Sequence, residues 1–202
     1  MLFNGKDLIG WKLINEKQKN GFKVVNGVLV NDPVQTEGAQ RVSYGNIRTE
    51  QEFEDFNLKI EVNVSEKGNS GIYLRGMYEV QVLDSYKDEK SPRSPAIQDV
   101  MSSSKHIIPP SEEMGGVYSR INPVVKAEKP AGTWQTFDIT LCERHITVIL
   151  NGTKIIDNQP VYGPTGGAII SDVFAPGPIY LQGDHSAASF RNIVLTPIIK
   201  GN

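Results

Sequence analysis

The chain has 202 residues, 39% of them hydrophobic and 22% charged, and its 21 basic and 23 acidic side chains leave a net charge of −2. At about 150 residues per domain, this length predicts one domain over residues 1–202, with a core that needs no disulfide or metal ion. No basic block favours a nucleic-acid partner. The apolar runs fall far short of the roughly 20 residues of a membrane span. The residues after Met1, Leu-Phe-Asn-Gly, do not show the pattern expected of a secretory signal peptide.

Apolar and polar residues alternate with a period of two along much of the chain. The pattern is clearest at 56–64, where Phe56, Leu58 and Ile60 alternate with polar residues, as expected for a strand with one face in water. Similar patterns predict strands at 22–25, 28–30, 71–75, 79–83, 134–141, 146–150, 154–156, 179–182 and 189–195.

Turn signals separate these strands. Asn26-Gly27 and Asn151-Gly152 lie between β-rich segments, and Asn-Gly favours the positive φ angles of a type I′ turn, so both predict hairpins. No segment keeps an apolar stripe of helical period for three turns. Many short antiparallel strands predict an all-β sandwich of two sheets or a barrel.

One segment breaks the pattern, because residues 87–114 contain four of the 12 prolines and six serines with little alternation. It is too long for an ordinary hairpin loop and too short for a domain. We interpret it as a surface excursion between two strands, which is either a lid or rim for a site or a tolerated insertion. His106 belongs to this segment and is expected at the surface.

The densest polar cluster on predicted strands lies at 69–84. A two-residue turn at Gly76-Met77 would mix apolar and acidic side chains on one face, whereas a three-residue loop at 76–78 pairs Arg75 with Glu79. Because a one-residue slip turns every side chain to the other face, burial favours the three-residue loop. One solvent-reachable face then holds Tyr73, Arg75, Glu79 and Gln81, and the core face holds Ile72, Leu74, Val80 and Val82.

Two interpretations of this polar face remain open. It is either a cross-strand Arg75–Glu79 pair on a solvated surface, of the kind that contributes up to about 1 kcal/mol, or part of a sugar-binding site. The second interpretation rests on the combination of an aromatic ring, a cation, an acid and an amide in one patch.

A second polar group lies near the C-terminal end, where Gln182, Asp184 and His185 follow a predicted strand and Arg191 alternates outward from the next one. His185 with Asp84 or Asp184 offers ligands for a divalent cation, although no HxH or CxxC spacing accompanies them. His145 is expected at the surface, and Cys142, Trp11 and Trp134 are expected in the core. Nucleophile-elbow, Walker and dinucleotide-binding motifs are absent from the sequence.

Six motifs occur in a fixed order: LFNGKDLIGW at 2–11, NSGIYLRG at 69–76, YEVQVLD at 78–84, PAGTWQTFDITL at 130–141, ITVILNG at 146–152 and ASFRNI at 188–193. Together they resemble the 3-keto-disaccharide hydrolase family over nearly the whole chain, apart from residues 87–114. The resemblance implies a concanavalin-like jelly roll whose two curved sheets present one concave polar face. It also implies a secreted or periplasmic protein that acts on glycosides oxidised to a ketone at C3.

The resemblance carries the family's polar positions onto seven residues of this chain: Arg75, Glu79, Gln81, Asp84, Gln182, His185 and Arg191. We expect Glu79 to remove the C2 proton that the ketone acidifies, and His185 to protonate the C1 leaving group before water adds back. Arg75 or a bound cation would stabilise the enolate oxygen. The remaining polar residues would bind substrate: Tyr73, Gln81, Asp84, Gln182 and Arg191.

Two competing functions are compatible with the same fold. EVQVLD at 79–84 resembles the E-x-D-x-x-E strand of jelly-roll β-glucanases, which use two carboxylates. Here Gln81 replaces the central Asp and Asp84 replaces the last Glu, and a neutral Gln cannot tune neighbouring pKa values as a carboxylate does. The other alternative is a carbohydrate-binding module without catalytic activity, which the fold alone does not exclude.

Overall fold

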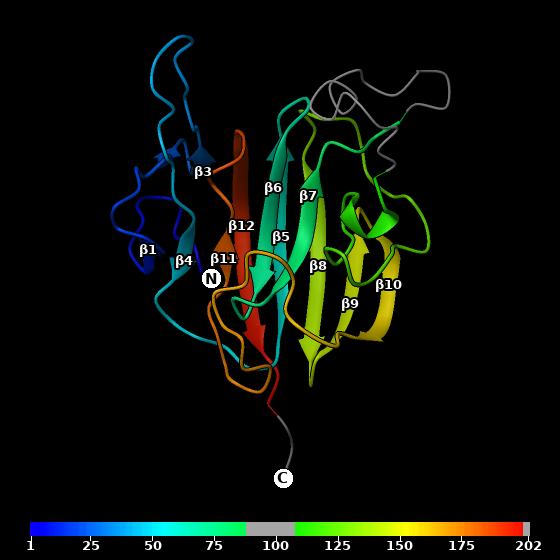
Figure 1. Cartoon of the computed structure of the whole chain (residues 1–202). Coiled ribbons are helices and arrows are strands. Elements are labelled where there is room, and N and C mark those ends of the chain that lie inside the picture. The colour runs from blue at the N-terminus through cyan, green and yellow to red at the C-terminus, as the bar shows by residue number, and fades with distance from the viewer. Residues whose placement is uncertain (88–107, 200–202) are drawn as a thin grey trace.

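Two antiparallel sheets packed face to face form the molecule (Figure 1). This computed structural model describes residues 1–87 and 108–199. One sheet has five strands in the order β1-β4-β11-β6-β7, and the other has seven in the order β10-β9-β8-β5-β12-β3-β2. The only helical element of the described chain is the 3-10 turn η1 (Pro110–Glu112). The predicted all-β jelly-roll class is therefore confirmed.

The five-stranded sheet contains β1 (Trp11–Leu13), β4 (Ile47–Thr49), β11 (Tyr180–Leu181), β6 (Asn69–Leu74) and β7 (Tyr78–Leu83). The seven-stranded sheet contains β10 (Thr153–Pro160), β9 (His145–Leu150), β8 (Gln135–Cys142), β5 (Phe56–Val64), β12 (Ala188–Pro197), β3 (Val28–Asn31) and β2 (Phe22–Val25). Strands β1 and β4 have only three residues each, too few to show an alternating pattern, and are not among the predicted strands.

Type I′ turns join neighbouring strands as the Asn-Gly pairs predicted. Asn26 and Gly27 have φ angles of 51° and 80° between β2 and β3, and Asn151 and Gly152 have φ angles of 51° and 83° between β9 and β10. A third two-residue turn, 143–144 between β8 and β9, also has two positive φ angles without a glycine. Propensity alone does not reveal that turn, because side chains disfavour this conformation.

The core lies between the two sheets, where the inward side chains of β5 meet those of β6 and β7. Trp11 is buried there as predicted. Trp134 is not in the core, because it is partly exposed beneath the Arg191 guanidinium, 4.0 Å from the ring centroid. Cys142 is also only partly buried, and its Sγ lies 3.7 Å from Asp55 Oδ2. His145 is exposed as expected.

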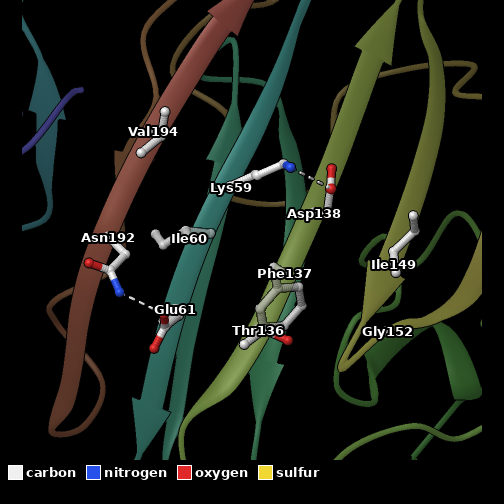
Figure 2. A pocket seen from close by; sticks show the side chains of 10 residues that line it. All are labelled: Lys59, Ile60, Glu61, Thr136, Phe137, Asp138, Ile149, Gly152, Asn192 and Val194. Carbon is white, nitrogen blue, oxygen red and sulfur yellow. Dashed lines mark hydrogen bonds and ion pairs between the residues drawn. The ribbon is translucent and has the colours of Figure 1, made fainter.

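The seven-stranded sheet bears a cavity of about 450 Å³ on strands β5, β8, β9 and β12, and Figure 2 shows its side chains. The charged groups of this cavity bind one another. Lys59 Nζ lies 3.5 Å from Asp138 Oδ2, and Asn192 donates to Glu61 Oε1 at 2.6 Å. Because these groups are already partnered, this face is a poor candidate for catalysis. Within the described residues, no helix is long and apolar enough to cross a membrane.

Candidate active site

The β6–β7 hairpin determines which side chains reach the site. Tyr73 pairs with Glu79, Gly71 with Gln81, and Leu74 with Tyr78, so the loop consists of residues 75–77. Three of the four residues predicted for the polar face share it, because Tyr73, Glu79 and Gln81 point away from the core side that holds Ile72, Val80 and Val82; Arg75 does not. The predicted pairing is wrong by two residues, a shift that preserves the faces.

Arg75 therefore does not pair with Glu79. It belongs to the loop, with a φ of 53°, and its guanidinium donates to the carbonyl oxygens of Val173 and Ala175. Its exposed fraction is 2%, and it lines a different cavity of about 430 Å³ that also contains Arg144. The positive φ takes Arg75 out of the strand, and the carbonyl groups of the 173–175 segment satisfy its charge.

A cavity of about 340 Å³ lies on the face of the five-stranded sheet that points away from the core. It brings together five of the predicted residues: Tyr73, Glu79, Gln81, Gln182 and His185. Asp184 completes the loop group, and four side chains that the sequence analysis did not assign complete the wall: Asn46, Asn69, Tyr118 and Tyr180. Its volume is near the lower end of the roughly 300–1,000 Å³ typical of small-molecule sites.

Hydrogen bonds to the Glu79 backbone, on the side of β7 away from β6, hold this residue in place. Glu79 N donates to Thr165 Oγ1 at 2.9 Å, and Glu79 O accepts from Tyr118 N at 3.0 Å. Val117 bridges Val80 in antiparallel fashion, so residues 115–118 extend the sheet beyond β7. The chain returning from the predicted excursion thus supplies a cavity wall through Tyr118, while residues 88–107 of that excursion lie outside the described residues.

The Glu79 side chain is enclosed, which corrects the expectation that it faces solvent. Its exposed fraction is 4%, and burial raises its pKa to about 7, because a desolvated carboxylate is unfavourable. The Tyr73 hydroxyl and the charge of His185 oppose this rise, whereas Asp184 adds to it. A carboxyl with such a pKa is suited to exchange protons near neutral pH.

Asp184 and His185 form a hydrogen-bonded pair beside Glu79. His185 Nδ1 lies 2.8 Å from Asp184 Oδ1, and this hydrogen bond is the main cause that raises the pKa of His185. Burial is the largest single influence on Asp184 and disfavours its charged form, but the hydrogen bond and charge of His185, a backbone hydrogen bond and the charge of Arg41 together outweigh it, so the pKa of Asp184 is lowered. Nδ1 of His185 is bonded to Asp184, so Nε2 of the half-exposed imidazole is the nitrogen that can exchange a proton with a substrate.

Two stacked tyrosines form the floor of the cavity. The rings of Tyr73 and Tyr180 lie 3.7 Å apart at 14°, and their hydroxyls donate to the carbonyl oxygens of Gly166 and Gly167. Gly167 has a φ of +77°, and a Cβ there would lie 2.5 Å from the Tyr73 hydroxyl. Glycine is therefore required where this loop crosses the tyrosines.

Amide groups supply acceptors in the wall. The Asn69 Oδ1 and Gln182 Oε1 atoms are buried and accept no hydrogen bond within the described part of the chain. Unpartnered buried acceptors are costly, so these two oxygens suit a ligand with several hydroxyl donors. Gln81 Oε1 accepts from Val82 N at 3.1 Å, which leaves the Gln81 amide nitrogen as a donor.

Two predicted binding residues do not line this cavity. Asp84 Oδ2 accepts from Lys67 N at 2.8 Å and stabilises the turn before β6. Arg191 lies on the other sheet, where Nε donates to Glu61 Oε2 at 2.8 Å and the guanidinium covers Trp134. Contacts within the protein therefore account for both side chains, and neither needs a substrate as a partner.

The expected cation ligands come together only in part. Asp184 lies beside His185, while Asp84 is bound at the Lys67 turn. Among residues 1–87 and 108–199, no group of three or more His, Cys, Asp or Glu side chains is arranged to hold a metal ion. The described residues therefore offer no preformed protein cage for a cation.

Comparisons with known proteins identify relatives of this fold. A family model described as a 3-keto-alpha-glucoside-1,2-lyase-like domain matches residues 1–196. Among curated proteins, none matches the chain. A provisionally assigned glycosyl hydrolase from Parabacteroides distasonis ATCC 8503 is 29% identical, with 98% of this chain and 82% of that chain covered and a TM-score of 0.68.

More distant structures support the fold alone. A second provisionally assigned glycosyl hydrolase from Parabacteroides distasonis is 22% identical, with a TM-score of 0.74 and coverage of 98% and 93%. The carbohydrate-binding module CBM66 from Bacillus subtilis is 11% identical, with a TM-score of 0.53 and coverage of 96% and 98%. Because the family model spans nearly every residue of the two sheets, the chain belongs to the 3-keto-alpha-glucoside-1,2-lyase-like domain family.

Proposed function

We propose that this protein cleaves 3-keto-glycosides by removing the C2 proton, eliminating the C1 substituent and adding water. One observation carries the proposal: a buried carboxyl with a pKa of about 7 shares a small polar cavity with a hydrogen-bonded Asp–His pair. This arrangement places a carboxyl that can act as a base near neutral pH beside an imidazole that can act as an acid. The choice of a 3-keto sugar as the substrate rests on membership of the 3-keto-alpha-glucoside-1,2-lyase-like domain family.

Glu79 acts as the base. A carbonyl at C3 acidifies the C2 proton, and an ionised Glu79 takes that proton while the C–H electron pair forms an enolate with the ketone. The burial that raises the pKa of Glu79 to about 7 strengthens it as a base without preventing ionisation at neutral pH. The enolate oxygen would accept a hydrogen bond from the Gln81 amide nitrogen, since Gln81 Oε1 is already bonded to Val82 N.

His185 acts as the acid. When the enolate re-forms the ketone, a C1–C2 double bond forms, the C1–O bond breaks, and the leaving oxygen takes a proton from Nε2 of His185. Water then adds its hydroxyl to C1 and gives its other proton to Nε2 of His185, while Glu79 returns a proton to C2, so both residues regain their starting state and the net reaction is hydrolysis. The hydrogen bond to Asp184 raises the pKa of His185 and so favours the protonated form that donates this proton.

The other cavity residues bind and orient the sugar. Asn69 Oδ1 and Gln182 Oε1 accept hydrogen bonds from sugar hydroxyls, which would satisfy two buried oxygens without partners in the described chain. The Tyr73 and Tyr180 rings provide the apolar surface next to them. Arg75, which donates to the carbonyl oxygens at 173 and 175, has no role in this scheme other than holding that segment.

The two alternative functions make different demands on the site. A two-carboxylate glycosidase would use Asp84 with Glu79, but Asp84 is engaged with Lys67 N. A carbohydrate-binding module would need the stacked rings and amides but would not require a carboxyl with a raised pKa.

An activity panel separates these functions. It contains matched glucosides and 3-keto-glucosides, each tested with and without a chelator, on the wild type and on Glu79→Gln. We expect turnover of the keto substrates only, and a loss of about 10²–10⁴-fold in the variant, which is the usual contribution of a general base. Turnover of ordinary glucosides would support the two-carboxylate enzyme, whereas binding without turnover would support the binding module.

A further inference from the structure

A second cavity, of about 230 Å³, adjoins the proposed active site. Its lining includes Gln18, Arg41, Ser43 and Tyr44, and it shares Asp184 with the first cavity. The two cavities therefore meet at Asp184, whose hydrogen-bonded partner His185 lines only the first cavity, as Glu79 does.

The wall of the second cavity is preformed. Gln18 Nε2 donates to Ser43 Oγ at 3.0 Å, and Lys19 N donates to Ser43 O at 2.9 Å. Tyr44 is buried and its hydroxyl donates to Val34 O at 3.0 Å. These bonds fix the two chain segments against each other before any ligand binds, which lowers the entropic cost of binding.

Arg41 supplies unused donors at this cavity. It forms no hydrogen bond or ion pair with any residue in the described ranges 1–87 and 108–199, whereas Asp184 is already bonded to His185. Guanidinium has five N–H donors and no acceptor, so it suits hydroxyl oxygens. The positive charge of Arg41 also acts on His185, whose pKa is raised chiefly by Asp184 and lowered in part by burial and by Arg41.

The position of His185, the proposed acid, indicates what the second cavity binds. A general acid that protonates a leaving oxygen must lie between the reacting ring and the departing group. We infer that the second cavity is the leaving-group subsite, that it binds a hydroxyl-bearing unit such as a second sugar, and that Arg41 is its principal donor. This inference rests on the proposed function, because it takes His185 as the acid.

The test compares two substrates that share the keto sugar and differ in the leaving group. One is a disaccharide of 3-keto-glucose and glucose, and the other is methyl 3-keto-glucoside, which has nothing to place near Arg41. Arg41→Ala should raise KM for the disaccharide about tenfold or more, as expected for a lost hydrogen bond to a charged group. It should leave KM for the methyl glucoside unchanged. Arg144→Ala, in the β8–β9 turn, is the matched control and should change neither.

Each result decides the question. A selective rise in KM for the disaccharide, partly restored in Arg41→Lys, supports the subsite. An equal effect on both substrates, or on neither, overturns it while leaving the proposed function intact. Wild-type protein that turns over neither keto substrate overturns the proposed function, and this inference with it.

Discussion

The carboxylate of Glu79 lies directly over the backbone of Gly71 on the neighbouring strand. A Cβ at Gly71 would come within 2.5 Å of Glu79 Oε1, so a residue without a side chain is required for the carboxylate to occupy this place. Gly71 thus determines where the proposed base sits, although it has no chemistry of its own.

Gly71→Ala should lower kcat by about 10–100-fold, because it displaces the carboxylate by a distance that catalysis does not tolerate. The protein should remain folded, since the displaced atom is the flexible tip of Glu79. Steady-state kinetics with a 3-keto-glucoside checks the prediction. Gly163→Ala is the matched control, because a Cβ there meets nothing within 4 Å. Equal activity of both variants would contradict the assigned position of Glu79.

The buried carboxyl should also leave a signature in stability. The pKa of Glu79 is about 7 in the folded protein, against the ordinary value of 4.5 for a glutamate carboxyl. Between these values the folded state holds a proton that the unfolded state has lost, so stability falls as pH rises. The favourable contribution is complete below about pH 4.5 and disappears as pH passes 7.

Glu79→Gln should remove this loss. The difference in unfolding free energy between the variant and the wild type should grow in favour of the variant by up to about 3 kcal/mol as the pH rises from 4.5 to 8. This is the energy of the full pKa shift of Glu79. Urea unfolding of both proteins at the two pH values measures the difference, in which the other titrating groups cancel. Unfolding free energies that change in parallel would mean that Glu79 titrates normally.

The sequence predicted those parts of the site that depend on local patterns. Asn-Gly turns and alternating strands gave the hairpins, and burial of Val80 and Val82 gave the correct face for Glu79 and Gln81. The exact pairing was not predictable, because a shift of two residues buries the same side chains. The loop position of Arg75 depends on carbonyl groups about 100 residues away.

Other residues reach the site through contacts between distant parts of the chain, which no local sequence pattern predicts. Tyr118 reaches the cavity because residues 115–118 pair with β7, and Asn46 belongs to the connection before a strand of only three residues. Tyr180 and Asn69 were within reach of sequence reasoning, since Tyr180 lies two residues before Gln182 and Asn69 four before Tyr73, on the faces that these residues share.

Asp184→Asn should move the pH profile of turnover to lower pH. The Asp184 carboxylate raises the pKa of His185 by its hydrogen bond and adds to the burial that raises the pKa of Glu79. Removing the carboxylate lowers the pKa values of both residues. The alkaline limb of the profile, set by His185 as the acid, and the acidic limb, set by Glu79 as the base, should therefore both move to lower pH. A pH series of kcat/KM tests this, with Asp157→Asn as the control at an exposed ion pair. An unchanged profile would exclude the Asp–His pair from the reaction.

Arg75→Met should destabilise the protein without moving that profile. The variant leaves the carbonyl oxygens of Val173 and Ala175 without their buried donor, which typically costs about 1–3 kcal/mol. Urea unfolding and the pH series together check the result. A lower kcat at unchanged stability, or a shift in either limb of the pH profile, would mean that Arg75 takes part in catalysis.

The central claim is that this protein removes the C2 proton, and deuterium incorporation tests it most directly. A 3-keto-glucoside is hydrolysed in D₂O, and the sugar product is examined at C2 by NMR or mass spectrometry, alongside product incubated without protein as the exchange control. Elimination followed by hydration predicts deuterium at C2 above the control level, because Glu79 would exchange its proton with solvent. Hydrolysis that leaves C2 fully protonated would contradict this account.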